Sequence, residues 1–302
     1  MIPHDGTPPG GRLDSTGPGL ARRLERHELA YFPVCPFPIP TGEDREFLCR
    51  QQLGRLSHKN ISYDPHTGRV GGCALRTRGE NQRLRELLTA FSKEVTGWLT
   101  RALPNYAHAW ELDRVSFRPE EEATRQLRLT ARNDLLHIDA FPTRPTNGRR
   151  ILRCFVNLNP SEPRIWAVSD PFPELLRQFR HRPDFPRQVS VPWLSRIGDG
   201  IRQWFTARTV TRSPYDVFME RFHDYLKSND EFQERCPKRY WTFAPGSAWL
   251  AFTDSVSHAV LRGRYALEHS YFVPTHVLFL PAAAPMAYFR NLTEPMPLRR
   301  AA

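Results

Sequence analysis

The sequence predicts a mainly β fold with flanking helices, and three observations lead to this prediction. Short apolar runs of β type follow one another over residues 111–160 and again over 240–282. A proline-rich segment with short amphipathic stretches, 166–240, separates the two sets. Apolar residues at helical spacing fill much of 21–110. We therefore expect one domain over 21–282, in which N-terminal helices pack on a β-core that a partly helical insertion divides.

The strongest helical pattern covers residues 81–103. Its apolar residues recur every three or four positions and define one face, while Arg83, Glu86 and Lys93 lie off that face. This helix is expected to be scaffold rather than part of a functional site. The apolar face consists of Leu84, Leu87, Leu88, Phe91, Val95, Trp98 and Leu99.

Three further helices are predicted from weaker patterns. Residues 213–229 begin with Ser213, a typical N-cap residue, and Pro214, which suits the first turn of a helix. The other two cover residues 20–33 and 42–56.

Turn residues bound the strand-like runs. Pro245-Gly246 and Arg262-Gly263 stand where tight turns would reverse the chain. Between such turns the chain is expected to form short paired strands. The runs cover residues 110–119, 125–131, 135–141 and 150–160, with further runs between 238 and 281.

The two ends of the chain are expected to lie outside the domain. Residues 1–20 are rich in Gly, Pro, Ser and Thr and predict a disordered tail without the apolar segment of a secretory signal. Residues 283–302 are expected to form a loosely attached C-terminal tail. No run approaches the roughly 18 apolar residues that span a bilayer. The 5 cysteines are odd in number and include no CxxC pair, which indicates a reducing compartment and argues against a zinc or disulfide framework.

The net charge of the chain is +11, and arginine carries most of it. Such a surface favours an anionic partner, which could be nucleic acid, an anionic membrane face or an acidic small substrate. Composition does not choose among these three, and a solvated basic surface without a partner remains an alternative.

His137 and Asp139 carry the first chemical signal. They stand two residues apart in a predicted strand, so both side chains point to the same face while Ile138 points to the other. A histidine and a carboxylate in this relation supply two of the three ligands of a facial non-haem iron site. The motif is short, and taken alone it indicates an ordinary paired surface histidine by default.

The surroundings of the pair strengthen the signal. His258 lies in a β-type run far along the chain, and a jelly-roll barrel can bring such distant strands together. Arginines follow both places, and the planar guanidinium suits a bidentate grip on a carboxylate of a dicarboxylic co-substrate. These arginines are Arg149, Arg150 and Arg153 after the first place, and Arg262 and Arg264 after the second.

Two long segments carry a resemblance to a known family. The stretch LLHIDAFPTRPTNGRRILRCFVNLNP, 135–160, together with SHAVLRGRYALEHSYFVP, 257–274, is similar to the Kdo hydroxylase family. These Fe(II)/2-oxoglutarate-dependent dioxygenases oxidise 3-deoxy-D-manno-oct-2-ulosonic acid (Kdo) on the lipid A precursor of bacterial lipopolysaccharide. The resemblance extends over residues 21–282. It implies a double-stranded β-helix core, Fe(II) and 2-oxoglutarate as cofactor and co-substrate, and O2 as oxidant.

The resemblance also implies roles for particular residues. The iron ligands fall on His137, Asp139 and His258, with His269 and His276 as rivals for the third place. His258 is preferred because it alone stands just before the Arg-Gly turn. Arg153 or Arg264 would clamp 2-oxoglutarate, with Arg153 preferred, and Asn157 or Asn133 could donate a hydrogen bond to it.

The implied substrate is a Kdo sugar of Kdo-lipid A, hydroxylated at C3. Arg144 is the first candidate to contact a sugar carboxylate, with Arg149 and Arg150 as alternatives. The implied location is the cytoplasm, with at most peripheral, electrostatic contact with the anionic inner-membrane surface. Three aromatic residues could enclose the site or simply pack in the core: Phe141, Trp249 and Phe252.

Three other functions remain open from the sequence. An oxygenase acting on alkylated nucleic acid would explain the charge, but no loop near the metal motif combines aromatic and basic residues as base stacking requires. Nucleic acid is therefore not the expected partner. A metal-free jelly roll that binds acidic sugars is a second alternative. A structural partner protein with a basic face is a third.

Overall fold

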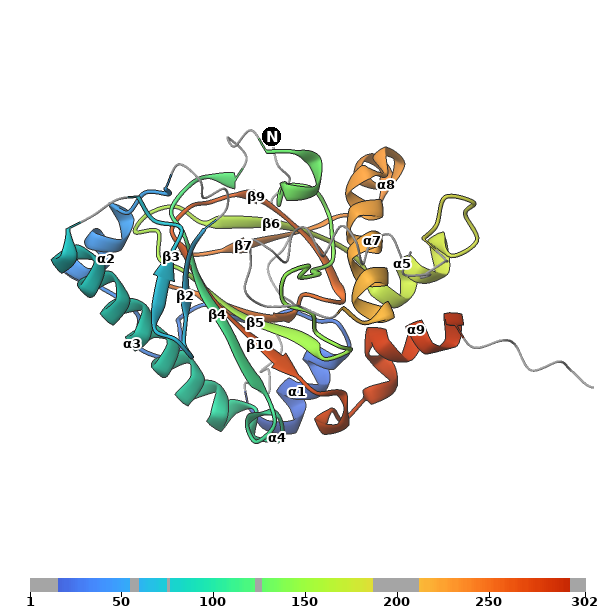
Figure 1. The fold of residues 1–302 in the computed structure, drawn as a ribbon, viewed down its shortest axis with the longest axis horizontal. Helices are drawn as coiled ribbons and strands as arrows, with labels where there is room; N and C mark the ends of the chain where they lie inside the picture. Colours follow the sequence, from blue (N-terminus) through green and yellow to red (C-terminus); the bar gives the residue numbers. More distant parts are fainter. Residues whose placement is uncertain (1–15, 55–59, 75–76, 123–126, 187–211, 294–302) are drawn as a thin grey trace, which may run out of the picture.

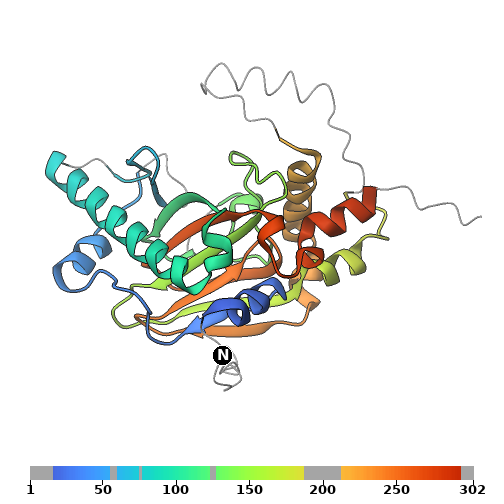
Figure 2. The ribbon, with the colours of Figure 1, turned by 90° about the horizontal axis from the view of Figure 1, so that it is seen from below.

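Two facing antiparallel β-sheets form the centre of the molecule, with helices on their outer sides (Figures 1 and 2). They are seen in a computed structural model, which describes residues 16–54, 60–74, 77–122, 127–186 and 212–293. Within this part of the chain, no helix is long and apolar enough to cross a membrane.

The larger sheet has seven strands and the smaller has three. The order in the larger sheet is β1 (Ala30–Phe32), β8 (Ala248–Phe252), β5 (Arg150–Asn157), β10 (Ala266–Val273), β4 (Glu111–Arg118), β2 (Ile61–Asp64) and β3 (Arg69–Gly71). The order in the smaller sheet is β7 (Arg239–Phe243), β6 (Arg164–Pro171) and β9 (Val256–Arg262). In the larger sheet β8 and β10 alternate with β1, β5 and β4, and in the smaller sheet β6 lies between β7 and β9, so strands far apart in the sequence are neighbours, as expected for the predicted double-stranded β-helix.

An aromatic core fills the space between the sheets at one end. Phe155 of the larger sheet stacks on Trp249 at 5.2 Å between ring centroids, and Trp166 of the smaller sheet meets both rings edge-on. Phe243 lies against Trp249 as well. Burial of these rings joins the sheets. The cluster directly borders polar side chains, since the Trp166 ring stacks on the His258 ring with 4.9 Å between centroids.

The outer face of the larger sheet is covered by N-terminal helices. The longest is α3 (Arg78–Ala102), whose first turn is fixed by a capping box between Thr77 and Glu80. The predicted apolar face of this helix is turned inward, with Leu84, Leu88 and Phe91 buried in the largest hydrophobic cluster. The other helices of this region are α1 (Gly17–Glu25), α2 (Gly42–Cys49) and α4 (Pro104–Ala107).

The insertion forms a separate helical layer against the smaller sheet. It comprises α5 (Phe172–Phe179), α7 (Pro214–Ser228) and α8 (Asp230–Arg235), and its own core includes Ala167 and Ala259 from β6 and β9. The predicted capping of residues 213–229 is present, since Ser213 and Asp216 form a capping box. The insertion begins after β6 rather than at residue 166, because Arg164–Pro171 pairs with both β7 and β9.

Several segments differ from the sequence prediction. Three short strands, β1, β2 and β3, lie within the region expected to hold only helices. Part of the predicted C-terminal tail forms α9 (Pro285–Thr293), whose Phe289 is buried in the core of the insertion. The described part of the predicted strand at 125–131, residues 127–131, contains the 3-10 turn η2 (Leu129–Ala131) instead. The predicted strand at 275–281 contains η3 (Thr275–Val277) and the start of η4 (Pro281–Ala283). Most of the N-terminal tail lies outside the described residues, although α1 already begins at Gly17.

Both predicted chain reversals are present. Gly246, between β7 and β8, has a φ of 74°, and Gly263, between β9 and β10, has a φ of 114°. A Cβ at Gly263 would also come within 2.8 Å of the Arg164 Cα. Only glycine fits this second turn, which follows directly on the strand that carries His258.

Candidate metal centre and cavity

The segment that carries His137 and Asp139 runs beside β9 without forming a regular strand. Its pairing is an isolated antiparallel bridge between His137 and His258, with N–H to O distances of 3.1 and 2.9 Å. The Asp139 N–H then donates to the Thr253 carbonyl at 2.7 Å. Ile138 points the other way and is buried in the core of the insertion. The predicted alternation of side chains therefore holds, although the regular strand does not.

His137, Asp139 and His258 converge. One potential ligand atom from each lies within 4.8 Å of the other two, and all three residues are buried. His137 Nε2 is 3.6 Å from Asp139 Oδ1. The Nδ1 atoms of the two histidines lie 2.7 and 2.8 Å from the carbonyls of Leu135 and Val256. Because a carbonyl only accepts, each Nδ1 carries the proton and each Nε2 keeps its lone pair for a metal.

The protonation states suit a divalent cation. Burial lowers the pKa of His137 and of His258, with nearby positive charge contributing at His137, so both rings are neutral. Burial alone would raise the pKa of Asp139, but the Arg153 guanidinium holds it well below its usual range. Two neutral imidazoles and one carboxylate are the donor set of a facial iron site. The residues present therefore fit a non-haem ferrous ion.

A chain of buried charges extends from Asp139 toward β4. Arg153 donates to Asp139 Oδ2 at 2.5 Å and pairs with Glu268 on its other side. Arg118 binds both oxygens of Glu268, at 3.0 and 3.2 Å, and also pairs with Glu122. Burial would raise the pKa of Glu268, but these arginines lower it to about 2. The carboxylate is therefore ionised, and Asp139 keeps Oδ1 available on the side of the histidines.

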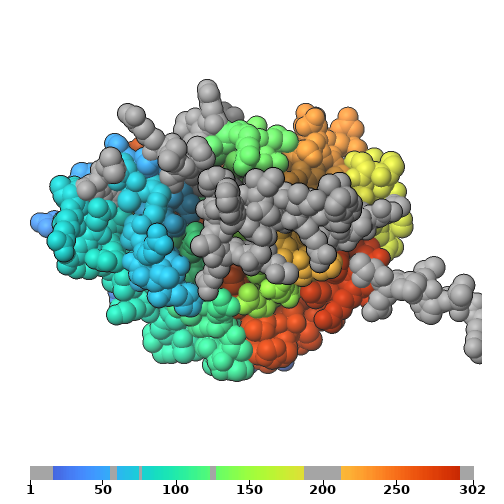
Figure 3. All heavy atoms as spheres, in the orientation of Figure 1, coloured from blue at the N-terminus to red at the C-terminus, as the bar shows by residue number. Residues whose placement is uncertain are grey.

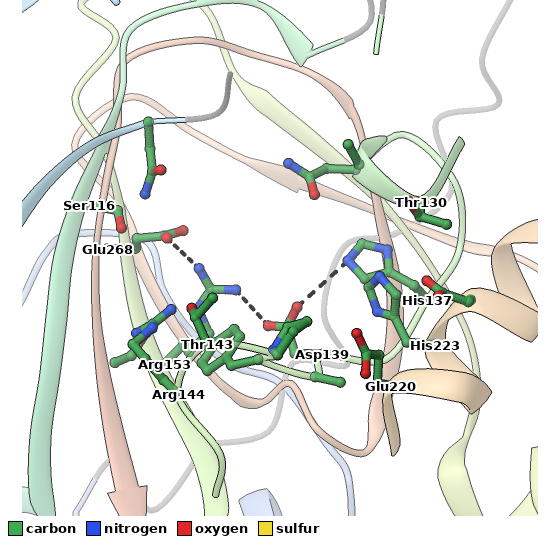
Figure 4. A pocket seen from close by; sticks show the side chains of 18 of the residues that line it. Ser116, Thr130, His137, Asp139, Thr143, Arg144, Arg153, Glu220, His223 and Glu268 are labelled. Carbon is green, nitrogen blue, oxygen red and sulfur yellow. Dashed lines mark hydrogen bonds and ion pairs between the residues drawn. The ribbon is translucent and has the colours of Figure 1, made fainter. Parts of the chain in front are cut away.

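A cavity of about 860 Å³ opens beside these groups (Figure 4). His137, Asp139 and Arg153 point into it, and Glu268 lies beyond Arg153 (Figure 4). Of the other residues singled out from the sequence, Arg144, Phe141 and Asn133 also line it. Figure 3 shows the face of the molecule that is turned toward the viewer in Figure 1. One side of that face is formed by β2, β3 and α3, and the other side by α5, α8 and α9.

The structure does not bring all the candidate arginines to the cavity. Arg264 is exposed, with its guanidinium 4.5 Å from the centroid of the Tyr265 ring. Arg149 pairs with Glu111 and bonds the Thr146 carbonyl at 2.8 Å. Arg150 is fully buried, where it pairs with Asp254 at 2.7 Å and donates to the Ser255 hydroxyl at 2.6 Å. These three side chains are absent from the cavity lining among the described residues.

Several other candidates serve the fold. The amide of Asn157 donates to the carbonyls of Glu162 and Phe243, both at 3.0 Å, and so fixes a turn. His269 bonds the Tyr271 hydroxyl at 2.6 Å, and His276 is exposed on η3. Neither rival histidine is in the three-residue cluster. Trp249 and Phe252 pack in hydrophobic clusters rather than in the cavity wall.

The cavity has lining residues that the sequence alone did not single out. Glu220, His223 and Asp224 come from one face of α7, and the 220/223/224 spacing of polar residues in a predicted helix was their available signal. Glu268 is the one acidic residue of β10, a strand that is buried along its whole length, and an acidic residue in such a strand is also a signal. The remaining polar residues of this kind are Asn60, Ser116, Arg118, Arg128, Thr130, Thr143 and Ser270.

Comparison with known proteins gives a consistent result. A family profile described as 3-deoxy-D-manno-oct-2-ulosonic acid (Kdo) hydroxylase matches residues 13–295. The chain is similar to an apo structure of the Kdo hydroxylase KdoO, described as a non-heme Fe(II) alphaketoglutarate-dependent dioxygenase, with 31% identity, coverage of 90% of this chain and 88% of that one, and a TM-score of 0.78. No curated protein matches the chain at a significant level.

Two further KdoO structures contain ligands. One is in complex with alphaketoglutarate and Fe(III) and is 30% identical in sequence to this chain. The match covers 90% of this chain and 88% of that chain, with a TM-score of 0.77. The other is in complex with cobalt(II) and is 30% identical in sequence. The match covers 94% of this chain and 92% of that chain, with a TM-score of 0.79.

The fold, the three converging side chains and these comparisons define a non-haem Fe(II)/2-oxoglutarate-dependent dioxygenase. Within that class, the chain belongs to the Kdo hydroxylase family. The predicted fold class, enzyme class and cofactors are confirmed. Membership of a family of hydroxylases also argues against the metal-free sugar-binding module considered above.

Proposed function

We propose that this enzyme hydroxylates C3 of a Kdo sugar in Kdo-lipid A. The observation that carries the proposal is the convergence of His137, Asp139 and His258 beside a cavity, in a chain of the Kdo hydroxylase family. The cavity volume of about 860 Å³ is in the range of small-molecule sites and can take 2-oxoglutarate together with part of a sugar.

The proposed ligands of the iron are His137, Asp139 and His258. When bound, iron supplies the oxidation of a C–H bond by O2, coupled to the conversion of 2-oxoglutarate to succinate and CO2. The residues around it orient the donor atoms: carbonyls hold both Nδ1 protons, and Arg153 occupies Oδ2 of Asp139. Asp139 would then offer the metal one oxygen, Oδ1.

Arg153 is the proposed clamp for the distal carboxylate of 2-oxoglutarate. It lies between Asp139 and Glu268 in the cavity wall, and its Nε is buried without a hydrogen-bond partner in the part of the chain that the structure describes. A buried, unsatisfied donor is costly, and a carboxylate would satisfy it. Arg118, held by Glu268, brings a second guanidinium to the same end of the cavity.

Arg144 is the proposed contact for the carboxylate of the sugar. It lines the cavity, pairs with Asp113 and lies 4.3 Å above the Phe141 ring. The pairing and the ring fix the direction of the guanidinium, which carries further N–H donors. Arg128, which is exposed and also lines the cavity, adds positive charge to the route of an anionic substrate.

The proposed location is the cytoplasm, with electrostatic contact at the inner face of the bacterial inner membrane. The net charge of +11 supports it, since each well-placed Lys or Arg adds about 1 kcal/mol of attraction to an anionic leaflet. Sedimentation with anionic vesicles, reversed by salt and absent with neutral vesicles, is the expected result. Equal recovery with both vesicle types would contradict the membrane contact.

The substrate proposal is tested by turnover. Purified enzyme with Fe(II), 2-oxoglutarate and O2 should release succinate when given Kdo-lipid A, and fragmentation mass spectrometry should place one added oxygen on C3 of Kdo. His137→Ala should abolish the reaction, and His276→Ala, on an exposed turn, should not. Turnover of alkylated DNA instead of the glycolipid would contradict the proposal.

A further inference from the structure

The metal-binding segment is supported differently on its two edges. In extended backbone, the N–H and C=O groups of neighbouring residues point to opposite edges. His137 exchanges both of its backbone bonds with His258, and the Asp139 N–H donates to the Thr253 carbonyl on the same edge. Leu136 and Ile138 direct their backbone groups to the other edge. On that edge the described residues supply no neighbouring strand, and α7 and α8 lie there instead.

Gln233 of α8 takes the place of a strand residue at Leu136. Its Oε1 accepts from the Leu136 N–H at 2.9 Å, and its Nε2 donates to the Leu136 carbonyl, also at 2.9 Å. A primary amide that binds both polar groups of one residue reproduces the paired bonds of an antiparallel ladder. Nε2 also donates to the Leu226 carbonyl at 2.8 Å, which fixes the amide to the end of α7.

His223 of α7 makes the next contact along the same edge. Its Nδ1 lies 2.6 Å from the carbonyl of Ile138, the residue between the two ligands, and must donate to it. The His223 ring meets the His137 ring edge-on, with 5.0 Å between their centroids. Figure 4 shows the two rings side by side. The backbone on both sides of His137 is therefore bonded to side chains of the insertion.

We propose that Gln233 and His223 are positioning residues of the metal site, through which the helical insertion acts as a substitute strand. They hold the backbone of Leu136 and Ile138, and so set the spacing between the His137 and Asp139 side chains. This inference rests on the proposed metal ligands. It gives α7 and α8 a role in metal affinity, in addition to the role of α7 in the cavity wall.

The expected effect is on metal binding rather than on folding alone. Outer partners that orient metal ligands typically change metal affinity by roughly 10- to 100-fold when they are removed. Gln233→Ala deletes both bonds to Leu136, and His223→Phe keeps an aromatic ring but removes the donor to Ile138. His223→Asn is the rescue variant, because the Asn Nδ2 can replace the histidine Nδ1 as donor. Glu234→Ala, exposed and next to Gln233 on α8, is the matched control.

The experiment is a titration of the metal-free variants with cobalt(II), followed by its visible absorption. Gln233→Ala and His223→Phe should bind cobalt(II) roughly 10- to 100-fold more weakly than the unaltered protein. His223→Asn should recover most of the loss, and Glu234→Ala should show none. Urea unfolding of the same metal-free proteins separates a loss of affinity from a loss of folded protein.

Two outcomes are decisive. Cobalt(II) affinities within about twofold of the unaltered protein in both variants, with lowered stability only, would overturn the positioning role and leave a structural one. If Gln233→Ala fails to fold, the comparison of His223→Phe with His223→Asn decides alone. Failure of the proposed metal site itself would look different, since the unaltered protein and His137→Ala would then bind cobalt(II) equally.

Discussion

Arg153 of β5 and Glu268 of β10 form a buried ion pair although they are two residues out of direct register. Glu268 is aligned with Phe155, and Arg153 with Ser270, so the two side chains meet diagonally across the strands. The same guanidinium reaches Asp139, and Arg118 holds the far side of Glu268. Two arginines and two carboxylates thus alternate along the cavity wall, and Arg153 has carboxylates on both sides.

The first prediction concerns the co-substrate. Arg153→Ala should raise the concentration of 2-oxoglutarate for half-maximal rate roughly 10- to 100-fold, because a hydrogen bond to a charged group is worth about 1.5–3 kcal/mol. Arg264→Ala should leave it unchanged, since that side chain is exposed and outside the cavity lining. Initial rates at saturating Fe(II) measure both. A larger effect in Arg264→Ala would mean that the clamp is misassigned.

The second prediction distinguishes the third ligand from its rivals. His258→Ala should lose stoichiometric binding of cobalt(II), because a buried three-ligand site then has only two donors. His276→Ala should bind as the unaltered protein does, since its ring is exposed on η3. Equilibrium dialysis with metal analysis gives the stoichiometry. Full binding by His258→Ala would remove that residue from the site.

The third prediction asks whether Arg149 and Arg150 stabilise the fold or bind the substrate. Arg150→Ala should lower the free energy of unfolding by about 3–5 kcal/mol, because it leaves the Asp254 carboxylate buried and unpaired. Arg149→Ala should cost much less, because its partner Glu111 is half exposed. Urea unfolding checks both variants. A stable Arg150→Ala protein with a raised KM for the glycolipid would instead support the substrate contact considered from the sequence.

The sequence could place His137 and Asp139 together because the signal is local. Alternation in extended chain puts His137 and Asp139 on one face whatever the partner strand is, and this remains true although the segment forms only an isolated bridge. The Arg-Gly turn after His258 is equally local, since the φ of 114° at Gly263 is one that glycine adopts readily and other residues rarely do. These features depend on a few consecutive residues, so they can be read without knowing the fold.

The buried charge network and the part of the cavity wall that α7 supplies could not be predicted from the sequence in the same way. Arg118 meets Glu268 because β4 pairs with β10 in one register, and a shift by one residue would turn one of the two side chains to the other face. Asn157 shares a strand face with Arg153, but its position next to a turn directs its amide to backbone carbonyls instead. Long-range register and local turn geometry decide these roles, and neither is contained in a short motif.

The last prediction concerns the acid sensitivity of the metal-free protein. Burial lowers the pKa of His269 to about 3, whereas an unfolded histidine titrates near its ordinary value of 6.5. Below pH 6.5 this histidine takes up a proton in the unfolded chain, but in the folded chain it does so only near pH 3. The free energy of unfolding therefore decreases as the pH is lowered from 6.5 to about 3. The largest slope from one such histidine is about 1.4 kcal/mol per pH unit.

His269→Gln tests this prediction. The glutamine does not titrate, so its free energy of unfolding should fall less steeply between about pH 7 and about pH 5 than that of the unaltered protein, by at most about 1.4 kcal/mol per pH unit. The variant starts from a lower value at pH 7, because it loses the bond to the Tyr271 hydroxyl and the packing of the ring. His276→Gln, at an exposed position, should keep the original slope. Equal slopes for the His269 and His276 variants, measured by urea unfolding at several pH values, would show that His269 takes up its proton in the folded state.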